Sequence, residues 1–155
     1  MNNFKELIDS FIKESGMQIE LEQDDSFSLE RDGLLVTVKY IKETDDITLF
    51  VPIIDHERIP ELTPPVLKAA LKLSFNGIGT SGNYLGLFDN ALILSTGIPL
   101  RDLDSEKLAE RLFLFSDAAI AVRDSIINEI QDDDQPIVTN NTPNLSDLGL
   151  AGIPV

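Results

Sequence analysis

The sequence predicts an α+β fold in which helices pack against a twisted, mostly antiparallel sheet. The predicted order is helix, three strands, helix, two strands, helix, so helices do not alternate one for one with strands as in parallel α/β folds. Short polar turns separate the strand segments, which favours antiparallel neighbours. The length of 155 residues and the apolar fraction of 43% suit one domain with its own core.

The chain opens with a predicted amphipathic helix that ends near Gly16. Apolar residues recur in it at intervals of three and four positions, which places them on one helical face. These residues are Phe4, Leu7, Ile8, Phe11 and Ile12. Gly16 favours the end of the helix there, because glycine readily adopts the left-handed conformation that follows many helices.

An antiparallel meander is predicted to follow this helix. Apolar and polar residues alternate with a period of two, which indicates extended strands with one buried face. The segments that show this pattern or form turns are, in order, Met17 to Leu21, Phe27 to Leu29, the turn Arg31-Asp32-Gly33, Leu34 to Ile41, the turn 42–46 and Ile47 to Ile54.

The second half of the chain is predicted to contain a helix, a hairpin and a long helix. Thr63 and Pro64 favour a helix start, and the helix is expected to run to Phe75. A hairpin of Asn83 to Phe88 and Ala91 to Thr96 is expected around the turn Asp89-Asn90. Asp104 is expected to cap the last helix. Two apolar stripes follow that helix to about Ile130, the first being Leu108, Leu112, Phe115, Ala119, Val122 and Ile126, and the second Phe113, Ile120 and Ile127.

The composition changes after the last helix, so we divide the chain into a domain of residues 1–131 and a flexible tail of residues 132–155. The tail begins with acidic residues and continues with Pro, Asn and Thr, a composition typical of a solvated segment. Its last eleven residues, 145–155, are apolar again but contain two glycines and a proline.

Charge and composition exclude several classes of function. The chain has 27 acidic and 12 basic residues and a formal net charge of −15, which opposes binding to nucleic acids or anionic membranes. It contains no Cys, so disulfides and Cys-ligated metal sites are excluded. No segment has the length and apolarity of a membrane span, and no secretory signal is visible, so an intracellular location is expected.

No motif in the sequence predicts catalysis, a metal site or a cofactor. The segment from Gly77 to Gly82 matches the glycine spacing of a dinucleotide-binding loop, but a predicted helix precedes it and a strand follows it, which reverses the required context. His56 is the only histidine, so a second histidine ligand for a metal is lacking. We therefore expect a protein that is not an enzyme.

Two segments carry more apolar residues than a one-sided core requires. In the predicted meander, Leu35, Ile41, Phe50 and Ile54 lie on the face opposite the main apolar face. The helix from Pro64 carries charge only at Lys68 and Lys72. These residues either pack within the same chain or form surfaces for a partner, and the pattern leaves both alternatives open.

Three segments resemble the class I chaperones of bacterial type III secretion, the CesT/SycE (Tir chaperone) family. The first is the opening helix, with the later sequence Ser-Phe-Ser-Leu-Glu-Arg-Asp-Gly that begins at Ser26 and leads into a strand. The second is Gly-Asn-Tyr-Leu-Gly-Leu-Phe from Gly82, continuing into Asn-Ala-Leu-Ile-Leu-Ser-Thr from Asn90. The third is Ile-Pro-Leu from Ile98, with Asp-Ser-Glu-Lys-Leu-Ala-Glu-Arg-Leu from Asp104.

The resemblance implies a homodimer of α-β-β-β-α-β-β-α subunits that acts in the bacterial cytoplasm without hydrolysing ATP. It implies that the dimer binds the N-terminal chaperone-binding segment of one or more secreted effectors and keeps that segment soluble and competent for export. The export ATPase and other secretion components are further candidate partners. The alternative is a small non-enzymatic adaptor or regulatory domain that binds a folded partner.

The implied contact residues form two sets. The effector-binding set is Phe4, Phe11, Leu35, Ile41, Phe50 and Ile54. The dimer-interface set is Val66, Leu67, Ala70, Leu71, Leu73, Tyr84 and Leu85.

Overall fold

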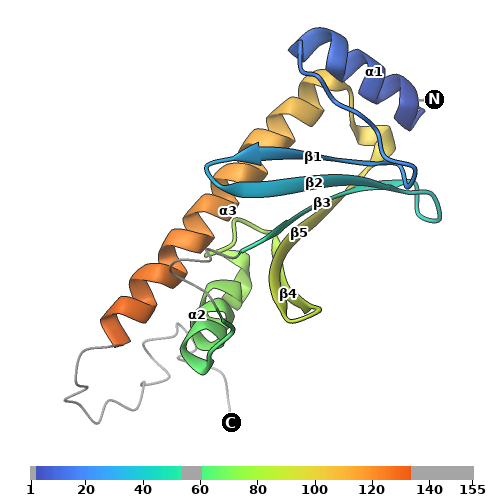
Figure 1. Ribbon diagram of the computed structural model, residues 1–155. Coiled ribbons are helices and arrows are strands. Elements are labelled where there is room, and N and C mark those ends of the chain that lie inside the picture. Colours follow the sequence, from blue (N-terminus) through green and yellow to red (C-terminus); the bar gives the residue numbers. More distant parts are fainter. Residues whose placement is uncertain (1–2, 54–60, 134–155) are drawn as a thin grey trace.

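The computed structural model describes residues 3–53 and 61–133, and these residues form an α+β fold (Figure 1). The predicted order of helices and strands is confirmed. The elements are α1 (Phe4–Ser15), β1 (Ser26–Arg31), β2 (Leu34–Ile41), β3 (Asp46–Pro52), α2 (Pro64–Ser74), the short 3-10 helix η1 (Phe75–Gly77), β4 (Tyr84–Phe88), β5 (Ala91–Pro99), the 3-10 helix η2 (Leu100–Asp102) and α3 (Ser105–Asp133).

The five strands form one antiparallel sheet in the order β1-β2-β3-β5-β4. Two-residue turns join β1 to β2 and β4 to β5, and all four turn residues have positive φ, as in the turns whose twist matches that of the strands. These residues are Asp32 (φ 50°), Gly33 (φ 77°), Asp89 (φ 46°) and Asn90 (φ 62°).

The core lies between α1, α3 and one face of the sheet (Figure 1). Residues with a period of two along β2 and β3 are buried on that face, and the first predicted stripe of α3 is buried against them. The buried residues are Leu34, Val36, Val38, Ile47, Leu49 and Val51 from the sheet, and Leu108, Leu112, Phe115, Ala119, Val122 and Ile126 from α3. The helix α2 packs beside the later part of α3, where Lys72 forms an ion pair with Glu129.

One local expectation needs correction, and a second is confirmed in its position but not in its side-chain contact. Met17 to Leu21 is not a strand, because β1 begins only at Ser26 and a turn between Glu22 and Ser26 reverses the chain before it. Thr63 occupies the N-cap position of α2, but its side chain makes no capping hydrogen bond. Pro64 and Pro65 occupy the first two helical positions and have no N–H group. Pro65 thereby removes one of the two donors that an N-cap side chain usually accepts from.

The glycine-rich loop is a structural connection between α2 and β4. Asn76 (φ 54°) and Gly77 (φ 67°) end the helical segment in the left-handed conformation. A Cβ atom on Gly79 would lie 2.7 Å from the carbonyl oxygen of Leu73, so this glycine allows the loop to approach the end of α2. The element order around the loop is the reverse of that in a dinucleotide-binding fingerprint, as the sequence predicts.

We predict that Gly79→Ala destabilises the protein, because the added methyl group must displace the backbone of α2. The expected loss is about 1–3 kcal/mol in the free energy of unfolding, the usual cost of overpacking. Gly97→Ala is the matched control, because a Cβ atom there meets nothing within 4 Å. Urea denaturation of both variants measures the difference, and equal midpoints would show that the loop has room to move.

Candidate functional site

The strand β1 forms one edge of the sheet and presents main-chain groups without a strand partner. In the β1–β2 register, the Tyr40 N–H donates to the Asp25 carbonyl oxygen (3.1 Å), so odd-numbered residues of β1 bond to β2. The N–H and C=O groups of Ser28 and Glu30 therefore point away from β2, towards the open edge. Such an edge can accept an additional strand.

An apolar hollow of about 410 Å³ lies beneath this edge, between β1, the end of α1 and the first half of α3. Its lining includes Phe11 from α1, Leu29 from β1 and Leu112 from α3. Met17 and Phe113 lie at the hollow with exposed side chains, and Phe113 is 58% exposed. Every second side chain of β1 points to this side of the sheet. An added strand would follow the same alternation, so every second side chain of the added strand would enter the hollow.

Arginine contacts hold the β1–β2 hairpin against α3. The Arg31 guanidinium lies 4.5 Å from the centroid of the Phe113 ring, donates to the Phe113 carbonyl oxygen (3.2 Å) and pairs with Asp117 (2.7 Å). Arg123 donates to the Asp32 carbonyl oxygen in the hairpin turn (2.7 Å). These contacts fix the position of the β1 edge relative to the hollow.

Charged groups also order the approach to β1. The Asp24 carboxyl accepts a hydrogen bond from the Ser26 hydroxyl (2.5 Å) and one from the Lys39 ammonium (2.9 Å), and these two bonds lower the pKa of Asp24 below its ordinary value. The pKa of Lys42 is raised by its hydrogen bond and charge interaction with Asp25. Both shifts favour the charged forms of Asp24 and Lys42, so the two ion pairs with Lys39 and Asp25 stabilise the turn.

The described residues contain no cluster of side chains suited to hold a metal ion. Among residues 3–53 and 61–133, no group of three His, Cys, Asp or Glu side chains is placed to hold a metal ion. His56 lies outside the described residues. No described helix has the length and apolarity to span a membrane. The open edge and its hollow are instead suited to binding an extended polypeptide.

The structure divides the predicted effector-binding residues between different places. Phe4 is a core residue (4% exposed) that stacks on Tyr40, so it offers no surface to a partner. Phe11 is also buried, but it lines the hollow beneath β1. Leu35, Ile41 and Phe50 lie on the opposite face of the sheet, where Leu35 is exposed and the other two are half-buried. Ile54 lies outside the described residues.

The predicted dimer-interface residues also divide into two groups. Val66 and Ala70 are buried within their own chain, because α2 turns this side towards α3. Leu67, Leu73 and Leu85 are half-buried, whereas Leu71 (74% exposed) and Tyr84 (72% exposed) project into solvent. The exposed apolar residues of this region form what we call the α2–β4 patch. It consists of Leu71, Phe75, Ile78, Tyr84, Leu87 and Phe88.

Sequence reasoning missed several residues of the hollow. Phe113 belongs to the second predicted stripe of α3, which suggested burial, and Met17 was assigned to a strand that does not form. The sequence predicts Arg31 only as part of the turn 31–33. The pairing of Arg31 with Asp117 joins residues 86 positions apart, and no local pattern encodes such a contact.

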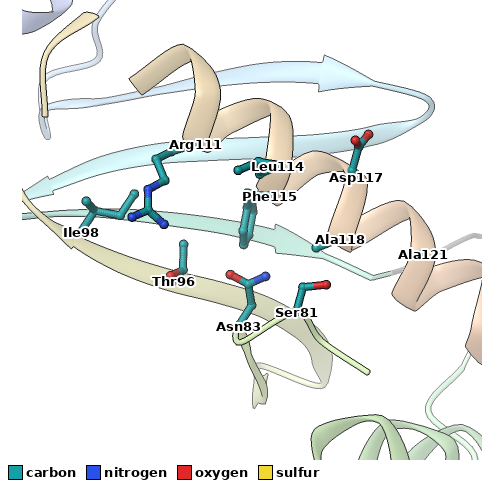
Figure 2. A pocket seen from close by; sticks show the side chains of 10 residues that line it. All are labelled: Ser81, Asn83, Thr96, Ile98, Arg111, Leu114, Phe115, Asp117, Ala118 and Ala121. Carbon is teal, nitrogen blue, oxygen red and sulfur yellow. The ribbon is translucent and has the colours of Figure 1, made fainter. Parts of the chain in front are cut away.

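A second hollow, of about 450 Å³, lies on the other side of α3, between this helix and β5 (Figure 2). Figure 2 shows Arg111 and Phe115 pointing from α3 towards β5, while Asn83 and Ser81 approach from the loop before β4. Asp117 points away from this hollow in the same view, consistent with its pairing with Arg31. These two hollows therefore flank α3.

Comparisons with known proteins agree with this architecture. The model of the Tir chaperone protein (CesT) family matches residues 6–123. No curated protein matches the sequence.

Three solved structures share the fold. The HopA1–SchA chaperone–effector complex matches with a TM-score of 0.60 and 20% identity over 78% of this chain and 93% of the other. The Yersinia pestis type III secretion chaperone SycH, in complex with a stable fragment of YscM2, matches with a TM-score of 0.55 and 19% identity over 77% and 99%. The ExsC–ExsE complex matches with a TM-score of 0.61 and 15% identity over 77% and 92%.

Proposed function

Since the chain belongs to the Tir chaperone protein (CesT) family, we propose that it is a type III secretion chaperone that binds the N-terminal segment of a secreted effector in the bacterial cytosol. The observation that carries this proposal is the open edge of β1 above an apolar hollow. Similar folds occur in a chaperone–effector complex and in a type III secretion chaperone bound to a protein fragment, which supports the same role.

An effector segment would bind by adding a strand to β1. Main-chain hydrogen bonds to Ser28 and Glu30 hold any extended sequence, because they involve no side chain. Alternate apolar side chains of the segment enter the hollow against Phe11, Leu29 and Leu112, and this apolar contact selects the segment. The net charge of −15 keeps the complex soluble while apolar effector residues are held.

The opposite face of the sheet offers a second contact for a long effector segment. Leu35 is exposed there, and Phe50 is half-buried opposite Thr37 of β2 and Ser95 of β5. A segment that leaves the β1 edge reaches this face by passing around a single strand. Leu35 and Phe50 therefore remain proposed effector contacts.

We also propose that two chains associate through the α2–β4 patch. Six large apolar residues from neighbouring elements are exposed there, including Ile78 at 81% and Phe88 at 70%. The β4 residues lie on both faces of the sheet, with Tyr84 and Phe88 on one face and Leu87 on the other, and an exposed apolar set of this size is typical of a protein interface. A second copy that presents the same patch would bury it, as in an isologous dimer.

Ser28→Pro is expected to weaken effector binding, because it removes the N–H group that points to the open edge. Proline is tolerated at an edge strand when its missing donor faces outward, so the fold should survive. The loss of main-chain pairing should reduce affinity about tenfold. The probe is the N-terminal segment of the polypeptide that co-purifies with the protein from its own cytosol, identified by native mass spectrometry, and calorimetry measures the affinity.

Ser28→Ala is the control for this variant, because it keeps the N–H group and removes only the hydroxyl that bonds to Thr37. Equal affinity of the proline and alanine variants would exclude strand addition at β1. A co-purifying partner that binds only as a folded domain would favour the adaptor function instead.

Phe50→Asp is expected to weaken effector binding while the fold and the dimer persist, because Phe50 lies on the sheet face away from the core. Thr48→Asp adds the same charge on the same face of β3 and serves as the control. Calorimetry gives the affinity, and circular dichroism the fold. Unchanged affinity would remove Phe50 from the effector surface, and global unfolding would show that it is a core residue.

Phe88→Asp is expected to dissociate the dimer, because it places a charge in the proposed apolar interface. Native mass spectrometry should change from twice the chain mass of 17.1 kDa to the single chain mass. Leu35→Asp, an equally drastic change at an exposed residue outside the α2–β4 patch, should leave the dimer intact. A wild-type protein that is monomeric at micromolar concentration would refute the interface.

A further inference from the structure

The strand β5 has an open edge of its own, beyond the point where β4 begins. Tyr84, the first residue of β4, pairs with Ser95, whereas β5 continues to Pro99. Even-numbered residues of β5 bond towards β3, as shown by the hydrogen bonds from Ile53 N–H to Leu92 O (2.7 Å) and from Leu100 N–H to Asp45 O (2.9 Å). The N–H and C=O groups of Gly97 therefore point towards the side that β4 leaves open.

This edge borders the second hollow, and together they form what we call the α3–β5 groove (Figure 2). Ile98, Leu114, Phe115 and Ala118 supply apolar surface. Arg111 also lines the groove, and within the described residues its guanidinium makes no hydrogen bond or ion pair. Asp102, Lys107, Glu110 and Asp117 also border the groove, so its charge is mixed. Its main-chain groups and apolar contacts are the features that bind an extended segment, and Arg111 can receive one acidic side chain.

We propose that the α3–β5 groove is a second polypeptide-binding site, and that its occupant in the free protein is the chain's own segment 145–155. This inference is independent of the effector-binding role proposed above, because it concerns a different edge of the sheet and a ligand within the same chain. Residues 134–155 lie outside the described residues, so the argument rests on the groove, the sequence of the segment and the length that connects them.

The chain between the end of α3 and residue 145 is long enough for segment 145–155 to reach the α3–β5 groove. α3 ends at Asp133, and Leu114 lies 19 residues earlier in that helix, or about 29 Å back along its axis at ~1.5 Å per residue. The eleven residues 134–144 can span up to about 36 Å at ~3.3 Å per residue. Segment 145–155 can therefore return along α3 and lie beside Gly97.

The chemistry of the segment matches the groove. Leu148 and Leu150 are two positions apart, so in an extended conformation both side chains point to the same side and can enter the hollow. Asp147 is the only charged residue of the segment, and its charge is opposite to that of Arg111. Because segment 145–155 belongs to the same chain as the groove, its binding is intramolecular. A short linker of this kind supplies an effective concentration in the ~mM range, which favours binding.

The absence of Cys in the chain allows a direct test in the full-length protein. A nitroxide label on Ser146→Cys should broaden the NMR signals of the Gly97, Leu114 and Ala118 amides. Adding Leu148→Asp and Leu150→Asp to the labelled protein should abolish this broadening. The matched control is Ile137→Asp with Val138→Asp, which adds the same charge to the same tail outside the binding segment and should leave the broadening unchanged.

A second measurement reports on the Gly97 N–H group itself. Its hydrogen exchange should accelerate about tenfold in the Leu148→Asp, Leu150→Asp variant, as expected for ~mM effective concentration and a dissociation constant of ~0.1 mM. Broadening around Met17 and Leu29, or no localised broadening, would overturn the proposal. Broadening seen only when labelled and isotope-enriched chains are mixed would assign the groove to the tail of a second copy and would also overturn it.

Discussion

The contact between α3 and one face of the sheet determines where this protein can bind other chains. An α-helix is about 10 Å wide, whereas five strands at a spacing of ~4.8 Å place the outer strands about 19 Å apart. A single long helix therefore cannot cover the whole face. The helix α1 covers a further part of this face, and two hollows remain beside α3, one beneath β1 and one beside β5.

Each hollow adjoins a strand edge, and this combination is both useful and hazardous. Unpaired main-chain groups above apolar surface can capture an extended segment, but they can equally join two copies in an aggregate. The net charge of −15 opposes uncontrolled association, because every approaching copy carries the same charge. A binding partner must then contribute enough apolar burial and main-chain pairing to overcome this repulsion, which favours specific segments over nonspecific contact.

Polar contacts at the hairpin complement the apolar core. Arg31 and Arg123 connect the β1–β2 hairpin to α3 through a ring face, a carboxylate and main-chain oxygens. Arg31 lines the side of the hollow through its contact with Phe113 and leaves the space beside Phe11, Leu29 and Leu112 open. The apolar residues beneath the edge therefore remain available to a partner.

The sequence by itself determined the order of the elements, the two tight turns, the buried stripe of α3 and the structural role of the glycine-rich loop, because local periodicity and turn chemistry encode each of them. It also indicated the family. Only the tertiary structure decided that Phe4, Val66 and Ala70 are buried and that Phe113 is exposed. Periodicity identifies the apolar side of a helix, but whether a given residue on that side is covered depends on elements that are distant in sequence.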